Sequence, residues 1–385
     1  MRKIKTGIIG IGYIGVSHLE AIRRIGFAEI VAAADTNEEI AKKRAEDYYI
    51  PNHCTLEQML ADPEIDAIHN CTPNNLHFLV NSKIIEAGKH VFSEKPLGIN
   101  SIESAEMLKL LAQKPDIVHG VNFNYRMNPL VQEMKNRILQ GAIGKPMLVH
   151  GSYLQDWLLY DTDYNWRIEP EHGGPSRSIA DIGSHWMDLA QTVLNSRITA
   201  VCADLVTLLP IRKKPVAQLE TTFSSNININ YTETEIKTED YGAVLFRMEN
   251  GISGVFHVSQ MSAGRKCRFD IEVNGSLASF YWNQEEADKM WMGKRDDHNM
   301  TVMRCPKLIS DDAKGYTYLA AGHPEGWNDA LKNNIFAFYK WIAEGKKIGT
   351  EKPDFATFDD GHYIMLLIEA ILQSSKEKKW VEIGI

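Results

Sequence analysis

The sequence predicts an α/β protein of two domains. Residues 1–123 are predicted to form a doubly wound parallel sheet, and residues 124–385 an α+β domain with a large, mostly antiparallel sheet. Two observations predict this fold. A chain of 385 residues is longer than one hydrophobic core usually supports, since domains commonly hold roughly 100–200 residues. The first third alternates apolar runs with helical patterns, whereas the region after Thr199 consists mostly of short strand patterns.

The N-terminal domain is predicted from strands that alternate with helices. Its apolar runs, in chain order, are KTGIIG, EIVAAAD, DAIHNCT, HVFSE and DIVHGVN. Between them, residues 75–87 and 101–113 place apolar side chains three or four positions apart, which is the helical period. Strands separated by helices pair in parallel, so a sheet with both faces covered is expected.

The second domain is predicted to mix helices with an antiparallel sheet. Helices are expected over residues 129–140 and 178–194, with a strand at MLVHGSYL, and two late helices over residues 327–344 and 359–374. The sheet is expected at AVLFRMEN, ISGVFHVSQ, CRFDIEVNG and LASFYW, separated by turns such as Asn274-Gly275.

Composition excludes several classes of protein. A formal net charge of −8 disfavours a nucleic-acid partner, because such proteins usually present a basic surface. No apolar run approaches the roughly 20 residues of a membrane span, and the N-terminal MRKIKTGIIG lacks the features of a signal peptide. The five scattered cysteines lack disulfide or metal spacing, so a reducing cytoplasm and a small-molecule ligand are expected.

A phosphate-binding turn is predicted near the N-terminus. Gly10, Gly12 and Gly15, with Tyr13 and Ile14 between them, form G-x-G-x-x-G directly after a strand and before a helix. The glycines permit a tight turn, close approach of the backbone to a pyrophosphate, and close packing of the helix on the strand. The alternative is a glycine-rich turn that binds no ligand.

Asp35 favours a dinucleotide and, within that class, NAD. It ends the second strand twenty residues after Gly15, where an acid can accept hydrogen bonds from the adenosine ribose. A carboxylate there repels a 2′-phosphate, and no arginine follows, so NADP is the less favoured cofactor. Alternatively, Asp35 could cap the helix that begins near Glu38.

Three side chains are candidates for catalysis. Lys95 follows the strand HVFS, at the sheet edge where such proteins bind ligands, although a solvated surface lysine is the alternative. Asp181 and His185 are four residues apart and are expected on one face of the helix over 178–194, and His185 suits a general base. The alternatives for this pair are an exposed helical pair, half of a metal site, or a capping arrangement. The opposite face is apolar, with Ile182, Trp186, Leu189 and Val193.

A dense aromatic and polar stretch suggests a carbohydrate ligand. Indole rings suit the C–H faces of a pyranose, and polar side chains can bind its hydroxyls. The alternative is that individual tryptophans are core or subunit-interface residues. The stretch comprises Tyr153, Gln155, Asp156, Trp157, Tyr164, Asn165, Trp166 and Arg167, and Trp186 follows.

Nearly the whole chain resembles the Gfo/Idh/MocA family. The motifs that carry the resemblance, in order, are GIIGIGYIG, the strand-end Asp35, CTPNNLH, EKP, NFNYR and DIGSH. The resemblance implies Lys95, Asp181 and His185 as the catalytic set and a homodimer or homotetramer. It implies Thr72, Pro73, Asn74, His77 and Glu94 as cofactor contacts. We also expect Lys95, Asn122, Trp166 and Arg167 on the cofactor side, and Tyr125, Arg126, Gln155, Trp157 and His323 on the substrate side.

The expected activity is NAD-dependent oxidation of a secondary alcohol in a sugar or cyclic polyol, without a metal. The segments YLQDWL, NWR, GGPSR and DIGSHW look most like the levoglucosan dehydrogenase branch, which oxidises a pyranose at C3, while inositol and 3-keto-glycoside dehydrogenases compete. One alternative is a zinc-dependent alcohol dehydrogenase with ligands from Asp181, His185 and His150 or His323. The other is a non-catalytic regulatory protein that binds NAD and a sugar.

Overall fold

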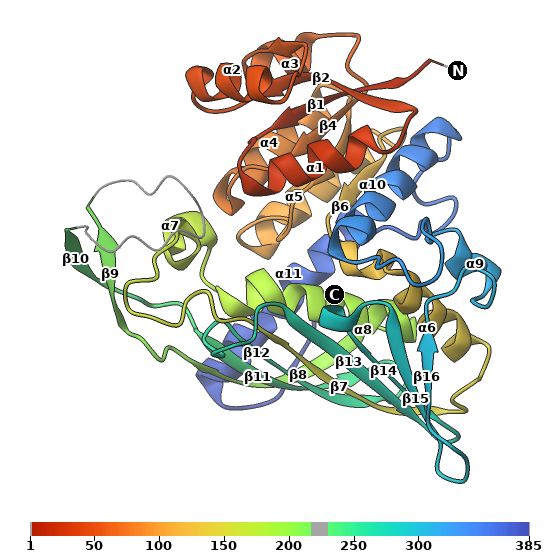
Figure 1. The fold of residues 1–385 in the computed structure, drawn as a ribbon. Helices are drawn as coiled ribbons and strands as arrows, with labels where there is room; N and C mark the ends of the chain where they lie inside the picture. Colours follow the sequence, from red (N-terminus) through yellow and green to blue (C-terminus); the bar gives the residue numbers. More distant parts are fainter. Residues whose placement is uncertain (1, 217–229, 385) are drawn as a thin grey trace. The chain divides into compact units, whose positions relative to one another are not determined.

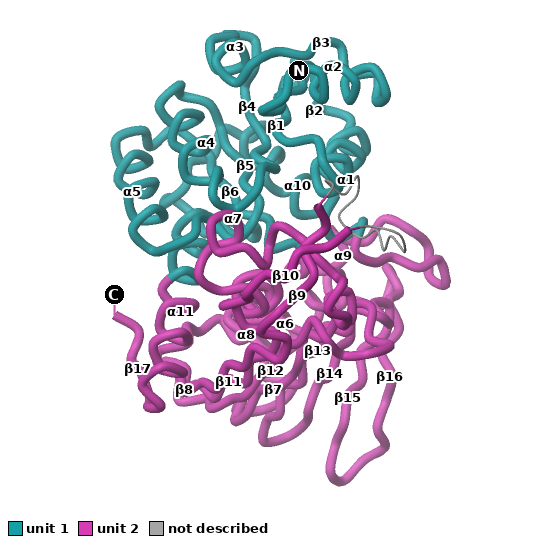
Figure 2. Tube along the Cα trace, turned by 90° about the vertical axis from the view of Figure 1, so that its left-hand side faces the viewer, with its two compact units in different colours: residues 1–124, 328–365 teal, residues 125–327, 366–385 magenta. Residues whose placement is uncertain are grey.

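The computed structural model describes residues 2–216 and 230–384, and its chain divides into two compact units (Figure 2). Unit 1 comprises Met1–Asn124 and Asn328–Met365, and unit 2 comprises Tyr125–Trp327 and Leu366–Ile385. Unit 1 thus includes residues 328–365, which the sequence analysis placed in the second domain.

Unit 1 is built on a six-stranded sheet in the order β3-β2-β1-β4-β5-β6. Every neighbouring pair of its strands is parallel. The order runs outward in both directions from β1 and β4, which makes their junction the switch point of the sheet. The strands are β1 (Ile4–Ile9), β2 (Ala28–Ala34), β3 (Asn52–His53), β4 (Ala67–Asn70), β5 (His90–Ser93) and β6 (His119–Val121).

The predicted helices over 75–87 and 101–113 are confirmed as α4 (Asn74–Glu86) and α5 (Ser101–Ala112). The other helices after these strands are α1 (Tyr13–Arg23), α2 (Glu38–Asp47) and α3 (Leu56–Ala61). Aromatic contacts explain why α10 (Trp327–Ala343) packs in this unit. The ring of Phe338 lies 5.1 Å from Phe92 of β5, and Tyr339 stacks on His69 of β4 at 5.7 Å.

Unit 2 contains a nine-stranded sheet in the order β16-β15-β14-β13-β7-β12-β11-β8-β17. Its pairs are antiparallel except for β7 with β12, so the predicted sheet is confirmed. Its strands are β7 (Pro146–Leu154), β8 (Ile198–Val206), β11 (Tyr241–Met248), β12 (Ser253–Ser259), β13 (Arg268–Gly275), β14 (Ser279–Asn283), β15 (Lys289–Gly293), β16 (Met300–Met303) and β17 (Val381–Glu382). A separate hairpin pairs β9 (Ile211–Pro215) with β10 (Tyr231–Glu235).

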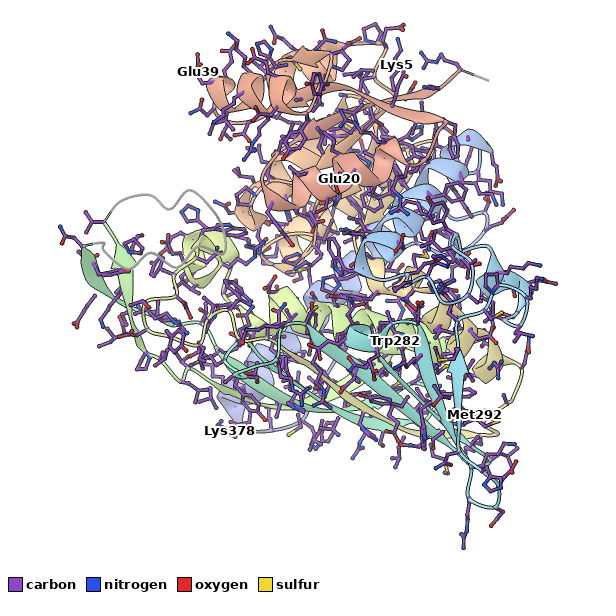
Figure 3. All side chains as sticks on the ribbon, in the orientation of Figure 1. Lys5, Glu20, Glu39, Trp282, Met292 and Lys378 are labelled. Carbon is purple, nitrogen blue, oxygen red and sulfur yellow. The ribbon has the colours of Figure 1, made fainter. Side chains whose placement is uncertain are left out.

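Helices cover one face of this large sheet (Figure 1). Trp186 of α8 is fully buried and stacks on Phe256 of β12 at 4.7 Å, and Trp282 of β14, labelled in Figure 3, is fully buried too. Trp186 is therefore a core residue rather than part of a sugar platform. The remaining helical segments are α6 (Pro129–Leu139), α7 (Pro170–Gly173), α8 (Ser184–Leu194), α9 (Asp311–Lys314), α11 (Phe358–Glu377), η1 (Asn124–Met127), η2 (Trp166–Ile168) and η4 (Gln284–Glu286).

The single helix predicted over 178–194 is wrong in detail. Ile179–Gly183 form a π-helix (η3), and only Ser184–Leu194 are α-helical. At the start of this segment, Oε1 of buried Glu239 accepts hydrogen bonds from the backbone N–H groups of Arg177 and Ile179, each at 2.9 Å. A carboxylate from another segment thus fixes the start of the helix. None of the described helices has the length and apolar character required to cross a bilayer.

Candidate functional site

In unit 1, the predicted cofactor residues all follow strands at one edge of the sheet. The turn at Gly10 follows β1, Asp35 follows β2, and Thr72 follows β4. Glu94 and Asn122 come directly after β5 and β6. Parallel strands end at the same edge, so the sheet gathers these residues around its switch point.

The glycine turn fits a pyrophosphate. Gly10 has a φ of +82°, and a Cβ there would lie 2.7 Å from the carbonyl oxygen of Cys71. A Cβ on Gly15 would lie 2.3 Å from the carbonyl oxygen of Gly10. Gly12 differs, because a Cβ there would meet nothing within 4 Å, and this residue caps α1 without a side-chain hydrogen bond. The turn therefore leaves open space beside a helix N-terminus, which attracts an anion. Tyr13 is exposed and Ile14 half-buried.

Asp35 is half-buried and does not cap α2. Asn37 is the N-cap, with its side chain accepting from the N–H groups of Glu39 and Ile40. The carboxylate of Asp35 instead accepts the Thr36 hydroxyl at 3.2 Å and the N–H of Asn37 at 3.3 Å. These bonds hold the carboxylate at the end of β2.

His77 ties together the loops that follow β4 and β5. Its Nδ1 lies 2.7 Å from the carbonyl oxygen of Pro96, and its Nε2 lies 2.8 Å from that of Thr72. Burial lowers the pKa of His77, and these two hydrogen bonds oppose that shift. Both ring nitrogens face backbone carbonyls, so His77 connects the two loops structurally. Asn74 begins α4, and Pro73 is its exposed N-cap.

Glu94 is a buried carboxylate surrounded by donors. Its Oε1 accepts from the Asn122 amide at 2.6 Å and from His18 Nε2 at 2.8 Å, and its Oε2 accepts the backbone N–H of Lys95 at 3.2 Å. Burial alone would raise the pKa of Glu94, but His18, Lys95 and Asn122 together lower it to about 2. Glu94 is therefore ionised, and the half-buried Lys95 follows it in the chain.

In unit 2, the side chains of Gln260 and Arg167 contact Asp181. Its Oδ2 accepts from the amide of fully buried Gln260 at 2.8 Å, and its Oδ1 lies 3.6 Å from Nε of Arg167. The Arg167 guanidinium also lies 4.4 Å over the ring of Trp166. The structure thus brings the predicted Arg167 and Asp181 together.

His185 stands one residue into α8, against two tyrosines. Its ring meets Tyr125 edge-on at 5.0 Å and lies 6.4 Å from the ring of Tyr153. The two phenol oxygens are 2.7 Å apart, and burial raises the pKa of both, which keeps them neutral. Because η3 is a π-helix, Asp181 and His185 are not related by the regular α-helical spacing that was predicted.

The other predicted substrate residues differ in their surroundings. Arg126 is buried and forms a two-pronged ion pair with Asp188 of α8, with Nε at 2.7 Å from Oδ2. Trp157 is half-buried and donates its indole N–H to Gln155 at 3.0 Å. His323 is exposed, and its carbonyl oxygen accepts from Arg304 at 2.5 Å.

Sequence reasoning missed several buried polar residues that shape these loops. Asn70 donates to Asn81 at 2.8 Å and accepts the Thr72 hydroxyl at 2.7 Å, and Gln260 orients Asp181. A usable pattern was present for Asn81, which lies on the buried stripe of α4 where an apolar residue is the rule.

Within the described residues, no three His, Cys, Asp or Glu side chains gather closely enough to hold a metal ion. The five cysteines are free thiols.

Two family models match the chain. Residues 4–123 match the oxidoreductase family with an NAD-binding Rossmann fold, and residues 131–281 match the GFO/IDH/MocA C-terminal domain. The two matches fall on the parallel sheet of unit 1 and on part of unit 2.

Characterised relatives cover the full chain. Levoglucosan dehydrogenase of Pseudarthrobacter phenanthrenivorans is 27% identical over 409 residues, covering 100% of this chain and 99% of that enzyme. Myo-inositol 2-dehydrogenase of Thermotoga maritima is 24% identical over 382 residues, covering 99% and 98%. A solved structure of levoglucosan dehydrogenase in complex with NADH and levoglucosan has a TM-score of 0.88 and 27% identity, covering 100% of both chains.

Proposed function

Because the chain belongs to the Gfo/Idh/MocA family of oxidoreductases, we propose that it transfers a hydride between a secondary alcohol of a sugar or cyclic polyol and NAD. One observation carries this proposal: the glycine turn, Asp35 and Lys95 all follow strands at the edge of an NAD-binding sheet. Similarity to levoglucosan and inositol dehydrogenases supports the class of substrate.

The chain's own residues supply the proton chemistry. When bound, NAD accepts the hydride from the carbinol carbon. We assign the hydroxyl proton to the imidazole of His185, which is the usual kind of general base at neutral pH. In ketone reduction, protonated His185 returns that proton to the oxygen.

Lys95 and Asp181 hold the substrate in this assignment. The ammonium of Lys95 hydrogen-bonds the substrate oxygen and stabilises negative charge on it, as a zinc ion would in a metal-dependent enzyme. Asp181 orients the alcohol, and its contacts with Gln260 and Arg167 fix the carboxylate for that task.

The test is a screen of pyranoses and inositols with NAD at alkaline pH, followed by absorbance of the reduced cofactor. We expect turnover of levoglucosan or another pyranose oxidised at C3, with inositols as the next candidates. The His185→Ala protein serves as the control for a contaminating dehydrogenase. A protein that binds NAD and a sugar without turnover would instead support the regulatory alternative.

We also propose that the open face of the nine-stranded sheet forms a homodimer or homotetramer interface. Leu245 of β11 pairs in register with Val255 of β12, and their side chains are 50% and 40% exposed. Leu148 of the neighbouring β7 is 52% exposed. An antiparallel sheet can leave one face to water, but apolar side chains clustered on that face favour a protein partner.

A further inference from the structure

A network of hydrogen-bonded, buried polar side chains extends through unit 1 to Glu94. His18 Nε2 lies 2.8 Å from Glu94 Oε1, and His18 Nδ1 lies 2.8 Å from Nδ1 of His69. His69 Nε2 lies 2.9 Å from the Tyr339 hydroxyl, which lies 2.5 Å from that of Thr6. This network therefore links α1, β1, β4 and α10 to Glu94, the residue that precedes Lys95.

The groups of this network are buried, so their polar atoms depend on one another for hydrogen bonds. His18, His69 and Thr6 are fully buried, as is Tyr339, and Glu94 is 6% exposed. A carboxylate removed from water protonates unless charged or polar donors compensate. The described donors to Glu94 are His18, Asn122 and the Lys95 backbone, and only His18 and Asn122 reach it with side chains.

The hydrogen-bond pattern fixes one proton on His18. Its Nε2 faces a carboxylate, so this nitrogen must donate. The two facing Nδ1 atoms of His18 and His69 need one proton between them. The Tyr339 hydroxyl can donate to or accept from His69, so every hydrogen bond of the network can form with that proton on either imidazole. Burial lowers the pKa of His69, which keeps His69 neutral in both arrangements.

We propose that His18 is a positioning residue that keeps Glu94 ionised and fixed beside Lys95, and that the contact of His69 with Nδ1 of His18 holds the ring with its Nε2 facing Glu94. The proposal rests on the proposed function only for the role of Lys95. His18 lies on α1, which begins at the glycine turn, so the same helix that faces the pyrophosphate also holds Glu94. Glu20, two residues further along α1 and labelled in Figure 3, is exposed.

Several other groups influence Glu94. The charge of Lys95 also lowers its pKa. Buried His77 and buried Cys71 both interact electrostatically with Glu94. Because the pKa of Glu94 is depressed to about 2 in the folded protein, its stabilising effect is present above its ordinary pKa and is lost as the pH falls toward 2.

The proposal is tested in the full-length protein without cofactor, by infrared titration of Glu94 with the Glu94→Gln spectrum subtracted. The parent protein should keep an ionised Glu94 down to strongly acidic pH. His18→Phe removes the donor while filling the space, and should shift protonation upward by roughly 2 pH units or more. His18→Gln retains an N–H donor and should restore a large part of the shift.

Leu19→Ala is the matched control, because Leu19 is fully buried on the same helix and apolar. It should lower stability without moving the titration of Glu94. An unchanged titration in folded His18→Phe, or an equal shift in Leu19→Ala, overturns the proposal. If His18→Phe does not fold, nitrogen-15 NMR of the parent decides, because an unprotonated His18 Nε2 also overturns it. None of these readouts requires hydride transfer, so they stand apart from the test of substrate.

Discussion

His185 is the residue whose loss should separate chemistry from binding. His185→Ala is expected to lower kcat by roughly 10²-fold to 10⁴-fold, the usual range for a general base, with NAD affinity nearly unchanged. For the parent, kcat/KM for the alcohol should rise with pH, because oxidation needs the neutral imidazole, and the apparent pKa belongs to the coupled site. Steady-state kinetics and NAD titration measure both quantities.

The control for His185 is His298→Ala, which changes an exposed histidine of unit 2 and should leave turnover intact. Lys95→Ala should also reduce kcat, and the double variant should lose less than the product of the single losses, because groups acting on one hydroxyl are not additive. Near-normal turnover by folded His185→Ala would refute the assignment.

Asp35 is expected to decide between NAD and NADP. Its carboxylate at the end of β2 repels a 2′-phosphate, so NAD should bind more tightly in a fluorescence titration of both cofactors. Asp35→Ala should weaken NAD binding and narrow the difference. Glu38→Ala removes an exposed carboxylate in the first turn of α2 and should not change the preference. Equal or tighter binding of NADP by the parent contradicts the prediction.

At the scale of elements, the start of α8 depends on packing against the neighbouring strands. η3 places Asp181 beside Gln260, 79 residues later in the chain. Sequence periodicity located this helix and its apolar residues Ile182, Trp186 and Leu189, all of which are buried. Periodicity could not show the π-helix, since the spacing of apolar residues does not reveal a short local change of helix type, and it could not show the contact of Glu239 with the N-terminal amides, because Glu239 comes from a distant segment.

Gln260→Leu tests whether the hydrogen bond from Gln260 orders Asp181 in η3. Loss of a hydrogen bond to a charged group costs about 1.5–3 kcal/mol, so kcat/KM should fall by roughly 10-fold to 100-fold if Asp181 is ordered for the transition state. Gln260→Glu should lower it further, because a second carboxylate would face Asp181. Kinetics and thermal unfolding are measured together. A loss of stability with unchanged kcat/KM would make Gln260 purely structural.

At the scale of the whole molecule, the open sheet face should determine assembly. The parent is expected to be a dimer or tetramer by light scattering at micromolar concentration. Leu245→Glu combined with Val255→Lys places charges on the exposed apolar pair and should shift the protein toward monomer. Lys42→Glu is the control for a change of surface charge, because Lys42 is an exposed residue of α2. It should leave the oligomeric state unchanged. A monomeric parent would contradict the prediction.

Activity should also survive exhaustive chelation, because Lys95 takes the part of a metal in the proposed reaction. Turnover before and after dialysis against a chelator, with metal analysis of both samples, measures this. A stoichiometric, tightly bound metal whose removal abolishes turnover would favour the zinc-dependent alternative.

The sequence by itself determined the alternation of strands and helices, the glycine turn, and the positions of Asp35 and Lys95 after strands. These features follow local rules, because turn geometry and the period of apolar residues are set by near neighbours. Only the tertiary structure decided that α10 packs in unit 1, that Gln260 holds Asp181, and that His18 reaches Glu94. The physical reason is separation along the chain: Tyr339 and Thr6 are 333 residues apart, and only the packing of the folded core brings them into contact.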